Sequence, residues 1–140
     1  MGMYTELVLG LELEPDEKVL NVLKYMLGDV EEKPLDYDYS HSLFETARWD
    51  IMLRCDSYYF DGQTDSKLIF DRHGYVYLNV RCNFKNYSNE IELFLDWLKP
   101  YIKTDGFLGY TRYEEDYDPT LIYKEGRQIK YNFNGKHWYE

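Results

Sequence analysis

The stretch TELVLGLELEPDEKVLNVLKYMLGD, residues 5–29, joins two different hydrophobic periods without a break. Its first part places a leucine at every second position from Leu7 to Leu13, which is typical of a strand with one buried face. Its second part spaces apolar residues as on one side of a helix, starts after Pro15 and two acids, and stops at Gly28. The stretch predicts a half-buried strand followed directly by an amphipathic helix.

The remaining elements are expected from the same two periods. On the first strand the leucines should face a core, with Glu6 and Glu12 on the opposite face. A loop with neither period covers residues 29–47, and glycines Gly74 and Gly126 should close two hairpins. The other expected elements are strands at 48–60, 66–71, 75–84, 107–113, 120–124 and 128–134, and a second amphipathic helix within 87–103.

The order is therefore strand, helix, three strands, helix, three strands, in one domain over residues 1–140. Antiparallel strands with one apolar face, covered by two amphipathic helices, predict an α+β fold. The expected architecture is a two-layer sandwich with a mainly antiparallel sheet and both helices on one face. The hairpin sequences SKLIFDRHGYVYLNV (66–80) and PTLIYKEGRQIKYNF (119–133) match in order. An internal duplication is one interpretation of this match, and chance similarity between hairpins is the other.

Composition limits the partners of the chain. Its 140 residues carry a formal net charge of −10, and since binding to phosphates depends on Lys and Arg, we expect no direct nucleic-acid binding. No run is long and apolar enough for a membrane helix, and the start has no basic leader or cleavage site, so we expect a cytoplasmic protein without membrane contact. Cys55 and Cys82 have no close Cys or His companion, so neither a metal site nor a cofactor is predicted.

The stretch EEKPLDYDYSH, residues 31–41, raises the question of a calcium loop. A loop starting at Asp36 would need glycine at its sixth position and glutamate at its twelfth, where His41 and Ala47 stand. The later DYDPT, residues 116–120, spells the DxDxT pattern of phosphatases that form an aspartyl phosphate, but no hydrophobic parallel strand precedes it. The three histidines have no partner at a recognisable catalytic spacing. We therefore predict no catalytic residue and no enzyme.

The acidic stretches are the first candidate surface. If they fold onto one side, they could imitate the charge of a nucleic-acid backbone and attract a basic protein. Interleaved tyrosines would add rigid, amphipathic contacts of the kind that anchor interfaces. The predicted partner-binding residues are Asp36, Tyr37, Asp38, Tyr39, Glu114, Glu115, Asp116 and Asp118. The other interpretation is a solvated face that only keeps the protein soluble.

The face of the sheet opposite the core is the second candidate surface. If the alternate apolar residues of the strands face the core, the residues between them place Arg and Tyr on this opposite face. Both suit an anionic signalling nucleotide, because Arg forms two parallel hydrogen bonds with phosphate and Tyr stacks on a base. Such a ligand could also lie between the subunits of a homo-oligomer. The predicted ligand-binding residues are Arg54, Tyr58, Tyr77 and Arg81, and Asn79, Arg112, Lys130 and Asn132 are expected on the same face. The other interpretation is an ordinary exposed face with cross-strand pairs.

The runs YTELVLGLEL (4–13), MLRCDSYYF (52–60) and LNVRCNFKNYSNEIELFLDWLKPYI (78–102) resemble a group of small uncharacterised proteins of low-GC Gram-positive bacteria and their phages. No activity or site residue comes with this resemblance. It implies an inhibitor, since short acidic proteins carried by phages or beside toxin genes often inhibit another protein. The expected function is a non-enzymatic inhibitor, of anti-defence or immunity type, of a host defence or toxin protein with a basic surface. The alternative is a protein that sequesters the anionic nucleotide.

Overall fold

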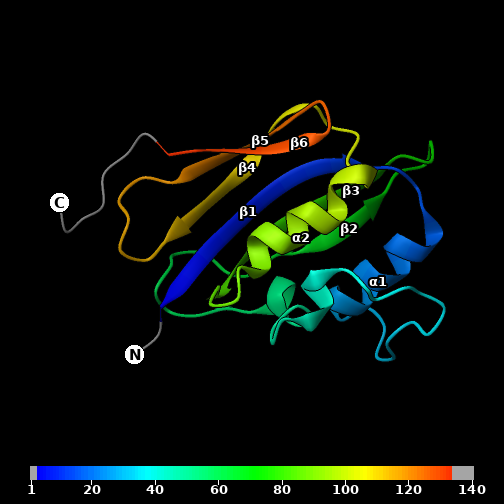
Figure 1. Cartoon of the computed structure of the whole chain (residues 1–140), viewed down its shortest axis with the longest axis horizontal. Coiled ribbons are helices and arrows are strands. Elements are labelled where there is room, and N and C mark those ends of the chain that lie inside the picture. The colour runs from blue at the N-terminus through cyan, green and yellow to red at the C-terminus, as the bar shows by residue number, and fades with distance from the viewer. Residues whose placement is uncertain (1–2, 134–140) are drawn as a thin grey trace.

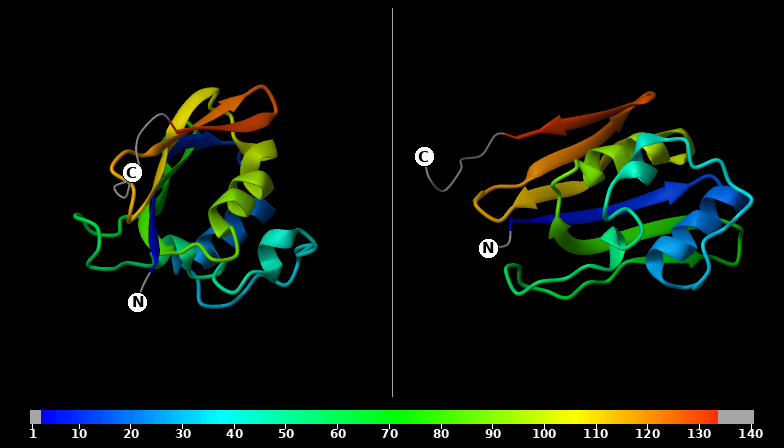
Figure 2. Two further views of the ribbon diagram at one scale, coloured as in Figure 1. Left: turned by 60° about the vertical axis from the view of Figure 1, so that its left-hand side comes forward. Right: turned by 60° about the horizontal axis from the view of Figure 1, so that its bottom comes forward.

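A six-stranded antiparallel sheet and two helices make up the α+β fold of the chain, whose computed structural model describes residues 3–133. The strands lie in the order β2-β3-β1-β4-β5-β6. Figure 1 shows α2 crossing one face of the sheet, and Figure 2 shows both helices on the same side of it. The elements are β1 (Tyr4–Leu13), α1 (Glu17–Leu27), β2 (Lys67–Phe70), β3 (Val76–Lys85), α2 (Glu90–Leu98), β4 (Gly106–Tyr113), β5 (Thr120–Glu125) and β6 (Gln128–Asn132), with short 3-10 turns η1 (Ser42–Glu45), η2 (Met52–Arg54) and η3 (Lys99–Tyr101).

The first strand is the centre of the sheet, as its leucines predict. β1 pairs with β3 along its whole length, from Tyr4 opposite Lys85 to Leu13 opposite Val76, and with β4 on its other side. Its four alternate leucines are 0 to 4% exposed and pack with the inward residues of β3, α1 and α2. The core therefore lies between the sheet and the helices. The prediction that the leucine face of β1 is buried is confirmed.

Both helices have defined ends. Asp16 caps α1 by accepting a hydrogen bond from the Val19 amide (3.1 Å), and Gly28 ends it with φ +82°. At α2 the Asn86 side chain accepts from the Ile91 amide (2.9 Å), and the residue in the N-cap position, Asn89, makes no side-chain cap. The predicted positions of both helices are therefore confirmed.

The strand expected at 48–60 is wrong. This segment contains η2 and loop, and Trp49, Met52 and Leu53 are buried while Ile51 is 39% exposed. Apolar residues at 49, 51, 52 and 53 satisfy both the strand period and the helical period, and burial follows the helical one. The Cys55 carbonyl still accepts from the Asn83 amide (3.1 Å), so the segment borders β3 at one backbone bond without joining the sheet.

The two hairpins occupy different places in the sheet. In the first, β2 is an edge strand and β3 is internal; in the second, β5 is internal and β6 is the edge. Their turns do carry the expected glycines, with φ +89° at Gly74 and +60° at Gly126. The sequence match therefore does not correspond to equivalent positions, which favours chance similarity over duplication. Residue 134, the end of the last expected strand, lies outside the described residues.

Candidate functional site

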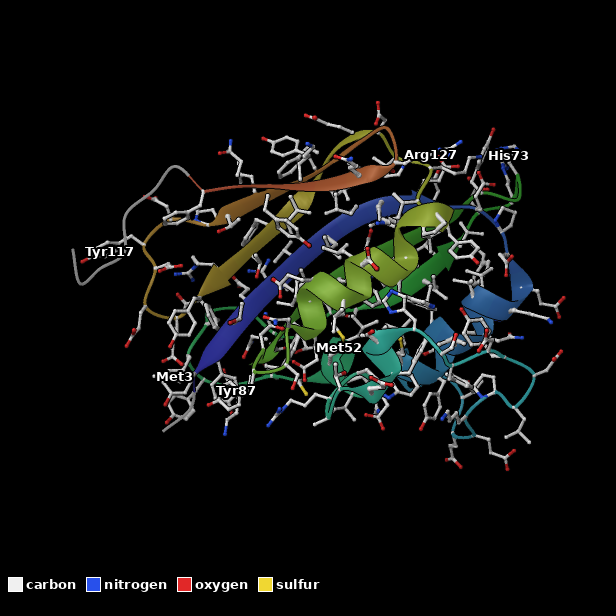
Figure 3. All side chains as sticks on the ribbon, viewed as in Figure 1. Met3, Met52, His73, Tyr87, Tyr117 and Arg127 are labelled. Carbon is white, nitrogen blue, oxygen red and sulfur yellow. The ribbon has the colours of Figure 1, made fainter. Side chains whose placement is uncertain are left out.

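The two acidic stretches lie at opposite ends of the molecule. The Glu114 amide bonds to the Tyr4 carbonyl at the start of β1 (3.0 Å), whereas Asp36 lies 3.6 Å from Lys18 on α1, beyond the other end of β1. A strand of ten residues is about 30 Å long. Both views in Figure 2 keep the 29–47 loop and the β4–β5 turn apart, and Figure 3 has Tyr117 at the far end. The predicted single acidic surface does not form.

Within the first stretch, the tyrosines point inward and the acids outward. The Trp97 indole N–H of α2 donates to the Tyr37 hydroxyl (2.8 Å), and the Tyr37 and Tyr39 rings meet edge to face at 5.1 Å. Phe44 packs edge-on against Tyr39 at 4.9 Å, and the Lys33 ammonium lies 4.2 Å from the centre of that ring. Burial raises the pKa of both tyrosines. These partly buried rings hold the loop onto the helices, whereas Asp36 and Asp38 are exposed.

A histidine completes the attachment of this loop. His41 Nδ1 accepts from the Leu43 amide (3.0 Å), so Nε2 carries the proton and donates to Asp96 on α2 (2.8 Å). Lys99 donates to the other oxygen of Asp96 (2.7 Å). The hydrogen bond from Lys99, followed by the one from His41, lowers the pKa of Asp96. His41 therefore joins the 29–47 loop to α2.

Exposed tyrosines gather with acids at the other end, over the starts of β1 and α2, the 55–66 loop and the β4–β5 turn. Tyr58 is 89% exposed and stacks on Tyr59 (4.7 Å), which stacks on Tyr4 (5.2 Å). Figure 3 labels Tyr87 and Tyr117, which are 57% and 73% exposed, at the same end. We define the end surface as Tyr4, Tyr58, Tyr59, Tyr87, Tyr113, Tyr117, Glu114, Glu115, Asp116 and Asp118.

Several contacts hold the end surface together. The Tyr4 amide donates to the Glu114 carboxylate, and the Tyr113 hydroxyl contacts Met3 Sδ (2.8 Å). Burial raises the pKa of Tyr113, and the nearby charges of Glu115, Glu114 and other groups including Tyr87 add to this effect. Tyr113 and the carboxylates of Glu114 and Glu115 are therefore close enough to act on one another.

The sequence did not predict the buried glutamate beneath this end. Glu6, expected to face solvent, is only 4% exposed. Its two oxygens lie 3.9 Å from Arg81 Nη2 and 3.7 Å from Arg112 Nε. The Arg112 guanidinium also lies 5.0 Å from the centre of the Phe60 ring, and Phe60 is 6% exposed. This contact between Arg112 and Phe60 holds the 55–66 loop, which carries Tyr58, against the sheet face opposite the helices.

The four predicted ligand-binding residues do not come together. Arg54 lies in η2 on the helix side, where its Nε donates to the Met26 carbonyl (3.1 Å), so its expected place on the opposite face is wrong. Tyr77 and Arg81 share that face but stand four residues apart on β3, about 13 Å. Arg81 is directed at Glu6, and Tyr58 belongs to the end surface. No single nucleotide-sized site contains all four.

Comparisons with known proteins give no match from which a function could be inferred. No family model matches the chain, and neither a curated protein nor a solved structure matches it. Among residues 3–133, no group of three or more His, Cys, Asp or Glu could hold a metal ion. In the same range no helix is long and apolar enough to cross a membrane. The resemblance to phage and Gram-positive proteins therefore stays a prediction.

Proposed function

We propose that this chain is a non-enzymatic binding protein, carried by a phage or mobile element, that inhibits a host defence or toxin protein. The inhibitor binds its target through the end surface. The target presents a basic surface, because the chain carries a net charge of −10 and the end surface contributes four of its acids.

The exposed stack of Tyr58, Tyr59 and Tyr4 is the observation that carries this proposal. A ring that is 89% exposed contributes little to the stability of the fold, yet this one is held in place by its neighbour at 4.7 Å. Stacked rings lose little conformational freedom on binding, so most of their contact energy is available to a complex. Tyrosine is also among the residues that most often dominate binding energy at interfaces.

The carboxylates complement these rings. Asp118 is exposed, and Glu115 and Asp116 are partly exposed, within one turn that also contains Tyr117. Acids around an aromatic centre speed the approach of a basic partner and disfavour acidic ones, nucleic acid included. The end surface therefore offers both an anchor and an electrostatic preference for Arg-rich and Lys-rich proteins.

A charge-reversal pair of variants tests the proposal. Tagged wild type, the variant Glu115→Lys with Asp118→Lys, and the variant Asp36→Lys with Asp38→Lys are each recovered from host cells. Any captured protein is identified, purified and assayed for activity with each variant. The proposal expects the first variant to lose capture and inhibition and the second to keep both, since Asp36 and Asp38 lie at the opposite end. Glu114 is left unchanged because it holds the Tyr4 amide.

Full inhibition by the Glu115→Lys, Asp118→Lys variant would show that the end surface is not the binding site. Loss in the Asp36→Lys, Asp38→Lys variant alone would transfer the site to the 29–47 loop.

A further inference from the structure

Three cations surround one pocket at the junction of α2 with the β5–β6 hairpin. The pocket has a volume of about 360 Å³ and is lined by Lys99, Pro100, Lys124 and Arg127. We call it the cation pocket. Three basic side chains around one hollow are unexpected in a chain with a net charge of −10. The predicted Arg and Tyr face shares none of these residues.

Local structure explains why these side chains converge. Lys99 is the C-cap of α2, where a cation is favoured by the partial negative charge of the helix end, and Pro100 follows in η3. Lys124 lies two residues after the buried Ile122 on β5, so both side chains face the helix side. Gly126, at φ +60°, forms the tight turn at whose tip Figure 3 labels Arg127.

The charges of the cation pocket are only partly balanced. Lys99 is paired with Asp96 at 2.7 Å. Lys124, which is half-buried, and Arg127 make no ion pair with any residue in 3–133. A partly desolvated cation without a counter-charge is unfavourable, and an anion between Lys124 and Arg127 would remove that cost.

We propose that the cation pocket binds a small phosphate-bearing anion. Arg127 can form a forked pair of hydrogen bonds with a phosphate, and the two lysines add point charges. A volume of about 360 Å³ falls within the range of small-molecule sites, about 300 to 1,000 Å³. This inference does not depend on the proposed function, because the β5–β6 turn and the end surface lie at opposite ends of β5.

The neighbouring hollow limits where the phosphate can lie. A second pocket of about 350 Å³ shares Lys99 but is otherwise lined by Glu92, Asp96, Gln128, Ile129 and Tyr131. Its two carboxylates would repel an anion. The phosphate therefore binds on the Lys124 and Arg127 side, and Lys99 contributes less because Asp96 already neutralises it.

Titration with inorganic pyrophosphate, with ADP alongside, tests the proposal in the wild-type protein at low salt. Amide NMR shifts locate the site, and calorimetry gives the Kd. We expect saturable shifts around residues 99, 124 and 127, and at least a tenfold higher Kd in Lys124→Ala and in Arg127→Ala. Lys18→Ala and Lys67→Ala, which remove exposed cations elsewhere, are the matched controls and should leave the Kd unchanged. Binding of ADP alone, with the same loss in both variants, would add recognition of the nucleoside.

Three results would overturn the proposal. The first is that neither probe binds saturably at concentrations up to about 1 mM. The second is binding with an unchanged Kd in the combined Lys124→Ala, Arg127→Ala variant. The third is a set of amide shifts spread evenly over all Lys and Arg residues. Both side chains are on the surface of a hairpin, so the variants should fold, and their amide spectra report this directly.

Discussion

Two stretches of this chain mix acids with tyrosines, and the fold uses them in opposite ways. In the 29–47 loop, Tyr37 packs against Trp97 of α2 and Tyr39 packs against Phe44 and Trp49, and their acidic neighbours are exposed. In the β4–β5 turn, Tyr117 is 73% exposed while Glu114 holds the start of β1. The same mixture of acids and tyrosines therefore attaches a loop to the rest of the fold at one end and leaves a tyrosine exposed at the other.

The difference comes from what lies beside each stretch. The 29–47 loop lies beside α2, whose Trp97 ring is 6.4 Å from the Tyr37 ring, and the loop's own Phe44 ring is 4.9 Å from the Tyr39 ring. The β4–β5 turn extends beyond the helices in Figure 1, and its Tyr117 is 73% exposed. An aromatic ring becomes part of the core only where the topology brings apolar surface to it.

The largest expected effect is on the stability of the attached loop. Tyr37→Ala should lower the free energy of unfolding by about 2 to 3 kcal/mol, because it removes ring contacts and leaves the Trp97 N–H without its acceptor. Tyr37→Phe keeps the ring and should cost only about 1 kcal/mol. Urea unfolding measures both. Equal losses in the two variants would mean that the hydrogen bond, not ring packing, holds the loop.

A smaller, pH-dependent effect is expected at Asp96. Its lowered pKa means that the ionised carboxylate stabilises the fold above the pKa of an unfolded aspartate, about 3.9, and that this contribution is lost as the pH falls through the folded-state value. Asp96→Asn should therefore destabilise the protein at pH 7 by less than about 1 kcal/mol, and this difference should shrink as the pH falls through the folded-state pKa of Asp96.

Urea unfolding at several pH values measures this difference, and Glu31→Gln, which removes an exposed acid of the 29–47 loop, is the control. A difference between Asp96→Asn and wild type that does not change with pH would rule out the charged contacts with Lys99 and His41 as its cause.

The smallest effect on stability is expected at the end surface. Tyr117→Ala and Tyr58→Ala should each change the free energy of unfolding by less than about 0.5 kcal/mol, because both rings are largely exposed. If the end surface is the interface, each should weaken binding to the target about tenfold or more. A loss of stability in either variant as large as that expected for Tyr37→Ala would mean that the exposed tyrosines also stabilise the fold, so that the two stretches would not differ in this respect.

Parts of the site were accessible from the sequence and parts were not. The acids of the β4–β5 turn were among the residues predicted from the sequence, but the neighbouring tyrosines Tyr4, Tyr59 and Tyr87 come from distant segments. The cation pocket was missed for the same reason, since Lys99 and Lys124 are 25 positions apart and meet only through packing. Glu6 showed a normal strand pattern, and nothing local indicated that a loop would cover it.

The sequence by itself determined the elements whose hydrophobic period is unambiguous. The leucines of β1, the alternation in β3, the apolar faces of both helices and the glycines of two hairpin turns each allow one local structure, because burial and backbone sterics act within a few residues.

Only the tertiary structure decided the rest. It selected η2 over a strand at 52–54, partly buried Tyr37 while leaving Tyr117 exposed, and placed the two acidic stretches beyond opposite ends of β1. Each of these outcomes depends on which surfaces the strand order brings into contact. That order is set by the packing of the whole chain, which no local pattern encodes.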